Sequence, residues 1–204
     1  DAVHGLRLLV GARLDLTDDA GERAGSIIAY PKHREAYGRL SQLITLGRRR
    51  AGKGDCLLHL ADVEAWGAEM VLIAVADSFA QGDDAFRRLG GLAGDDFYIA
   101  VSRTYDGPSP PLPDGRLVAT NDVLMHEAAR RPLADVLTCI REGVTIDTAG
   151  RLTQANGERH LKSPAEMAVL VSWIAPSRCI RLCPEDTCHQ RQAAEDMICW
   201  GLGS

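Results

Sequence analysis

The chain has 204 residues, a mass of 22.0 kDa and a formal net charge of −5, with 46% hydrophobic and 25% charged residues. These values are typical of a globular chain of one domain, or at most one and a half, and they exclude a disordered one. The acidic balance argues against a general nucleic-acid binder, because phosphate contacts need a cationic surface. A role on DNA would therefore rest on a local patch or on parts of a larger protein.

The first 54 residues predict a β-hairpin and a long helix. Strands are expected at Leu6–Leu16 and Ser26–Tyr30, with the turn-rich stretch Thr17–Gly25 between them. Apolar residues at helical spacing predict a helix over Arg34–Arg50. A basic cluster lies at its end, where cations favour the helix dipole and where they could also meet DNA phosphates. The cluster consists of Arg48, Arg49, Arg50 and Lys53.

Helices and strands then alternate. The predicted order is helix Ala61–Glu69, strand Met70–Ala76, helix Asp84–Leu92, strand Phe97–Ser102, proline-rich loop Tyr105–Gly115, strand Leu117–Asp122 and helix Glu127–Glu142. A capping box with proline at the first helical position, Ser163–Glu166, starts a further helix. Such alternation favours an α/β fold with a largely parallel sheet or barrel. No apolar run approaches the roughly 20 residues of a membrane span, and no signal peptide is visible, so we expect a cytoplasmic protein without membrane contact.

Asp122 and His126 are the first candidates for chemistry. They follow a predicted strand, at the edge where α/β sheets bind ligands, and a carboxylate and an imidazole both suit a divalent metal ion. Two donors do not complete a site, because catalytic zinc takes three or more. An aspartate after a strand also commonly caps a helix or stabilises a turn.

Several runs resemble the N-terminal region of bacterial C-family DNA polymerases. They include Arg131–Gly143 and Arg159–Met167, and the similarity is to the error-prone branch, relatives of the polymerase III alpha subunit. Leu6–Leu16, Ala36–Lys53 and Leu117–Asp122 are similar to the same branch in the same order. The resemblance covers most of residues 4–171 and is poorer around residues 77–115.

The resemblance implies a PHP (polymerase and histidinol phosphatase) domain over residues 1–171, here an incomplete distorted β/α barrel. The whole enzyme adds deoxynucleotides to DNA in replication, repair and translesion synthesis, using Mg²⁺ held in a palm domain that lies beyond this chain. We therefore expect a fragment that is inactive alone. The alternatives are a non-catalytic scaffold, or a small metal-dependent phosphoesterase using Asp122 and His126.

In this family the PHP domain holds Zn or Mn in some members. An early His-x-His pair and an aspartate would precede residue 1, and Asp122 matches the family's later aspartate. The family has a histidine ligand two residues after that aspartate, but this chain has Leu124 there. His126 matches only a further histidine of the family. Arg103 occupies a position at which the error-prone branch often has histidine. A leucine has no donor and an arginine adds positive charge, so we expect a remnant that binds no metal.

The last 33 residues, 172–204, differ in composition. They hold four of the six cysteines and two of the three tryptophans. A zinc site is suggested by Cys179, Cys183, Cys188 and His189. However, a structural zinc site needs two pairs of ligands, and Cys188 and His189 are adjacent, too close to form the second pair. We prefer the interpretation that this tail is a frameshifted reading frame and disordered.

Overall fold

A computed structural model describes residues 9–79, 82–103, 105 and 113–171 of the chain. The chain divides into two compact units, and each is described by itself. Unit 1 comprises Asp1–Val101 with Pro113–Val118, and unit 2 comprises Ser102–Leu112 with Ala119–Ser204. The predictions for the tail, residues 172–204, lie outside the described residues.

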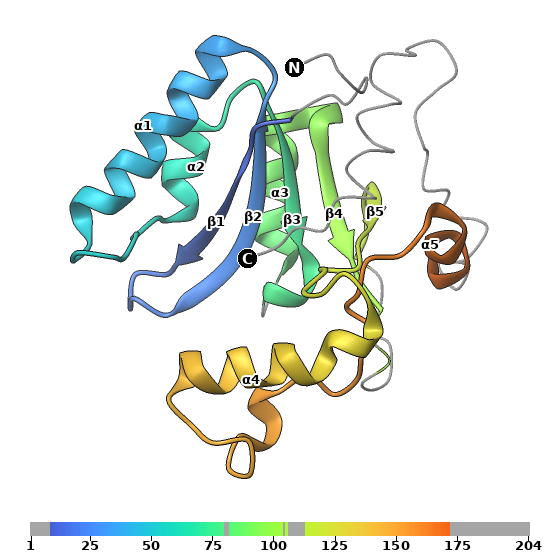
Figure 1. The fold of residues 1–204 in the computed structure, drawn as a ribbon. Helices are drawn as coiled ribbons and strands as arrows, with labels where there is room; N and C mark the ends of the chain where they lie inside the picture. The colour runs from blue at the N-terminus through green and yellow to red at the C-terminus, as the bar shows by residue number, and fades with distance from the viewer. Residues whose placement is uncertain (1–8, 80–81, 104, 106–112, 172–204) are drawn as a thin grey trace, which may run out of the picture. The chain divides into compact units, whose positions relative to one another are not determined.

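Unit 1 is built on a five-stranded sheet in the order β1-β2-β3-β4-β5 (Figure 1). The strands are β1 (Ala12–Thr17), β2 (Arg23–Pro31), β3 (Met70–Val75), β4 (Phe97–Val101) and β5 (Leu117–Ala119). The first two pairings, β1 with β2 and β2 with β3, are antiparallel, and β3 with β4 is parallel. The predicted α/β class is confirmed. In the described part of the chain the sheet is open, and the PHP-type barrel stays a prediction.

The sheet is mixed, whereas a largely parallel one was expected. The reason lies in the connection from β2 to β3, which contains two helices. After these helices the chain starts β3 beside the end of β2, with Pro31 opposite Met70. A single crossover helix would have carried the chain to the other end of the sheet and made the pair parallel.

Three helices contact the strands of unit 1 or one another: α1 (Arg34–Arg50), α2 (Leu60–Trp66) and α3 (Gly82–Ala93). Helix α1 has the predicted bounds. The strands alternate, so Leu14 and Leu16 of β1 share one face with Ile27 of β2, and all three are buried. The core also contains Leu40 and Leu43 of α1, Val63 of α2, Leu72 and Ala74 of β3, Leu89 of α3 and Ile99 of β4.

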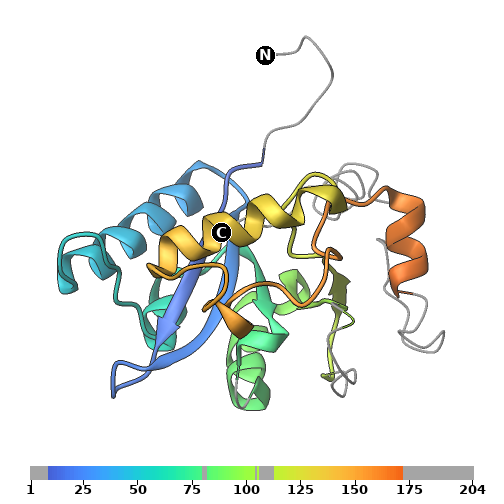
Figure 2. The ribbon, with the colours of Figure 1, turned by 60° about the horizontal axis from the view of Figure 1, so that its bottom comes forward.

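Unit 2 contains two α-helices in its described part, α4 (Arg131–Glu142) and α5 (Pro164–Val171) (Figure 2). Helix α4 ends at Gly143, whose φ of 66° is left-handed and whose N–H bonds to the carbonyls of Cys139 and Ile140. Helix α5 begins with the predicted capping box: the Ser163 N–H donates to Glu166 Oε2 at 2.8 Å, and the Glu166 N–H to Ser163 Oγ at 3.3 Å. None of the helices in the described residues has the length and apolar character needed to span a bilayer.

Candidate functional site

The candidate site begins where β5 ends, at the run Thr120, Asn121 and Asp122. Asp122 has a φ of 40°, in the left-handed region that aspartate and asparagine enter more readily than most residues. The Asp122 N–H donates to Thr120 Oγ1 at 3.2 Å. This turn ends the strand three residues earlier than the sequence predicted, at Ala119.

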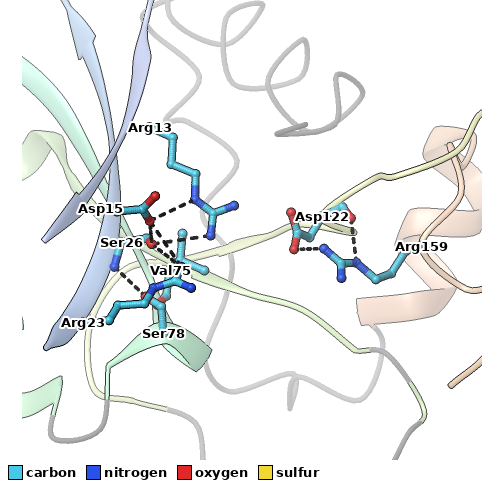
Figure 3. Close-up of polar contacts among 8 residues, drawn as sticks. All are labelled: Arg13, Asp15, Arg23, Ser26, Val75, Ser78, Asp122 and Arg159. Atoms are coloured by element: carbon cyan, nitrogen blue, oxygen red, sulfur yellow. Dashed lines mark hydrogen bonds and ion pairs between the residues drawn. The ribbon is translucent and has the colours of Figure 1, made fainter. Parts of the chain in front are cut away.

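Arg159 binds Asp122 at two points (Figure 3). Its Nε donates to the Asp122 carbonyl oxygen at 2.9 Å, and its Nη2 donates to the carboxylate oxygen Oδ2. A third bond, from Nη1 to Gln154 Oε1 at 3.0 Å, holds the guanidinium from the other side. The two side chains of the ion pair are only 20% and 28% exposed. A fixed positive charge therefore lies on the carboxylate that the sequence singled out as a remnant metal ligand.

Asn121 connects the same two segments. Its side chain is buried, and its Nδ2 donates to the carbonyl oxygens of Glu158, at 2.8 Å, and His160, at 2.5 Å. The backbone adds a bond from the Leu124 N–H to the Arg159 carbonyl at 2.8 Å. Residues 120–126 are thus held by residues 154–161. Sequence reasoning missed Asn121 and Arg159 as partners, since residues 37 or more positions apart leave no local signal.

The other positions that match ligand positions of the family do not complete a metal site at Asp122. The His126 side chain is 68% exposed, with Nε2 3.5 Å from Glu127 Oε1. Leu124 has no donor atom, and the Arg103 guanidinium lies 4.6 Å from the centre of the Tyr105 ring. Within the described ranges, no group of three or more His, Cys, Asp or Glu side chains is placed to hold a metal ion.

The predicted nucleic-acid cluster lies at the end of α1. Its four members, Arg48, Arg49, Arg50 and Lys53, are all exposed. Arg50 differs from the others because its Nη1 lies 2.5 Å from Asp62 Oδ2, and this hydrogen bond raises the pKa of Arg50 above its ordinary value. For the other three cations, the described part of the chain contains no ion-pair partner.

A second polar cluster lies on the β1–β2 hairpin and was not predicted (Figure 3). Ser26 is fully buried, and its hydroxyl donates to the Asp15 carboxylate. Arg23 Nη2 lies 2.8 Å from Ser26 Oγ and 3.2 Å from Asp15 Oδ1, and Arg13 Nε lies 3.8 Å from the same carboxylate oxygen. The Ser26 N–H donates to Ser78 Oγ at 2.8 Å, which ties the hairpin to the turn after β3. These contacts join the two strands of the hairpin to each other and to the turn after β3, so we interpret the cluster as structural.

Comparison with known proteins finds relatives named error-prone DNA polymerase. The chain is 41% identical over 176 residues to the error-prone DNA polymerase of Sinorhizobium medicae, 39% over 186 residues to that of Rhodopseudomonas palustris, and 39% over 178 residues to error-prone DNA polymerase 1 of Agrobacterium fabrum. The alignments cover 79%, 83% and 80% of this chain, but only 15%, 16% and 16% of the relatives. No family model matches the chain. This chain thus spans about 15% of the length of the curated relatives it matches.

Proposed function

We propose that this chain is a PHP-type module of an error-prone DNA polymerase. About four fifths of its length is homologous to one part of such enzymes. The module serves as a structural part of the polymerase and does not itself join nucleotides. The observation that carries the proposal is the level of identity, 39–41%, sustained over 176–186 residues. Similarity of that length is far more specific than any single motif in the chain.

Two segments link the proposal to the structure. Two of the runs that resemble the family, Arg131–Gly143 and Arg159–Met167, form α4 with its left-handed cap and the segment that leads into α5. Arg159, at the start of the second run, holds Asp122. The resembling residues therefore include those that maintain unit 2, as expected of a module whose role is architectural.

The non-catalytic role rests on the chemistry of the carboxylates. Nucleotide transfer by a polymerase uses metal ions held by converging carboxylates. Asp122 is bound to Arg159, and the other candidate, His126, is exposed beside Glu127. The same geometry gives little support to the alternative of a metal-dependent phosphoesterase. DNA, deoxynucleotides and Mg²⁺ belong to the proposed whole enzyme, and lesion bypass in DNA repair is its proposed role.

Primer extension tests the proposal on the chain itself. The purified 204-residue chain is incubated with a primed template, deoxynucleotides and Mg²⁺, beside the full-length Sinorhizobium medicae enzyme as positive control. We expect no extension by the chain under conditions in which the control extends the primer. Nucleotide incorporation by an activity that co-purifies with the chain would contradict the proposal of a non-catalytic module.

A further inference from the structure

The family resemblance implies a zinc or manganese ion near Asp122, and the residues that the structure describes there do not fit one. Such an ion needs at least three donor atoms that converge on it. Asp122 Oδ2 already accepts a hydrogen bond from Arg159, and Leu124 offers no donor. The imidazole of His126 is 68% exposed and lies next to Glu127.

We propose that the guanidinium of Arg159 takes the place of a bound cation at Asp122, so that residues 120–126 are held by an internal ion pair and do not require a metal. Arginine suits this role because it stays charged at every pH at which the protein is folded. Its planar fork also reaches two acceptors at once, here the carbonyl and the carboxylate of the same residue.

The surroundings of the pair favour a permanent interaction. Both side chains are largely shielded from water, so their attraction is screened less than that of a surface pair. Gln154 fixes the guanidinium through Nη1 at 3.0 Å. A metal ion would have to displace a cation that is covalently part of the chain, and among the described residues it would gain only one carboxylate.

The pair also supports the backbone around it. The Leu124 N–H donates to the Arg159 carbonyl at 2.8 Å, and the Leu161 N–H to the Met125 carbonyl at 2.9 Å. These amides lie within a few residues of the ion pair on both segments. Loss of the pair should therefore open them locally, before the rest of unit 2 unfolds.

Hydrogen exchange of the full 204-residue chain, followed by mass spectrometry, tests the proposal at these amides. In the unmodified chain, exchange in peptides covering residues 120–126 and 157–162 should be the same with excess EDTA, manganese chloride or zinc chloride. In Arg159→Ala the same peptides should exchange at least about tenfold faster, as expected when a partly buried charge loses its partner. Arg141→Ala removes an exposed cation of α4 that pairs with its neighbour Glu142, and should leave both peptides unchanged.

Two milder variants cover the case in which Arg159→Ala unfolds unit 2 and raises exchange in α4 as well. Arg159→Lys keeps the charge but loses the fork, and Asp122→Asn keeps the size but loses the charge. Both should speed exchange in the two peptides while α4 keeps its protection. The proposal is overturned if EDTA accelerates exchange in the unmodified chain, if manganese or zinc slows it, or if all the Arg159 and Asp122 variants match the unmodified chain.

Discussion

Arg50, the last residue of α1, pairs with Asp62 in the first turn of α2, with Nη1 2.5 Å from Oδ2. Asp62 also accepts the His59 N–H at 2.9 Å and so closes the capping box of α2. Burial raises the pKa of Asp62, but the hydrogen bonds from Arg50 and from the His59 backbone outweigh it, and the pKa lies below its ordinary value. One carboxylate thus joins two helices of unit 1.

Replacing Asp62 by alanine should destabilise the chain by about 1–2 kcal/mol at neutral pH, because α2 loses its cap and its link to α1. The pKa of Asp62 is lower in the folded chain than in the unfolded chain. Its contribution is therefore complete above about pH 5 and is lost as the pH falls through the lowered pKa.

Urea unfolding of the unmodified chain and of Asp62→Ala, at neutral and at acid pH, measures this difference. The gap between the two should narrow as the solution is acidified. Asp55→Ala is the matched control, because Asp55 is exposed in the loop between α1 and α2 and its side chain has no hydrogen-bond partner in the described part of the chain. If the difference in unfolding free energy between the two chains stayed the same at acid pH, Asp62 would act by packing and not by charge.

Two glycines of α1 should respond in opposite directions to the same substitution. At Gly47 an added Cβ would lie 2.6 Å from Cys56 Sγ and 2.7 Å from Leu58 Cγ, whereas at Gly38 it would meet nothing within 4 Å. Gly47→Ala should therefore destabilise the chain by about 1–3 kcal/mol through overpacking. Gly38→Ala should stabilise it by about 0.5–1 kcal/mol, because alanine favours the helix.

Thermal unfolding of the two variants, measured side by side, makes this comparison. Each variant is the control for the other, since helix propensity changes equally in both. A Gly47→Ala variant that is stabilised as much as Gly38→Ala would mean that Cys56 and Leu58 do not pack against Gly47.

Local signals explain what the sequence predicted well. The bounds of α1 and the capping box at Ser163 depend on residues within one or two helical turns. The predicted helix Glu127–Glu142 instead begins as the 3₁₀ turn Ala128–Arg130, and α4 starts at Arg131, where Pro132 suits the first turn.

Long-range contacts explain what the sequence left open. Arg159 and Asn121 act across 37 or more residues, and nothing near either one indicates its partner. The polar cluster of Arg13, Asp15, Arg23 and Ser26 on the β1–β2 hairpin could not be predicted for a different reason. Ser26 stands in an apolar strand run, and its burial beside Asp15 depends on the register of β1 against β2.

The basic cluster of α1 gives a further prediction. Arg48, Arg49 and Lys53 are exposed and have no ion-pair partner among the described residues, so they are available to DNA phosphates. The chain should bind a labelled DNA duplex weakly at low salt, since its net charge is −5. Replacing all three by alanine should lower the affinity and reduce the salt slope by about 0.9 for each phosphate that is no longer neutralised.

Fluorescence anisotropy across a salt series measures both quantities. Arg87→Ala is the control, because Arg87 is 73% exposed but already paired with Asp84 at 3.0 Å. An unchanged affinity and slope in the triple variant would remove this cluster from any DNA-binding surface.

If this chain is a structural module of an error-prone DNA polymerase, it should be able to replace the corresponding part of such an enzyme. This chain matches about 15% of the Sinorhizobium medicae enzyme. In the test, that stretch of the enzyme is replaced by the aligned residues of this chain. We expect the chimera to extend a primed template within about tenfold of the parent rate, and Leu72→Asp in the buried sheet of the graft to abolish this activity. A chimera that folds but does not extend the primer, although the parent does, would contradict the claim.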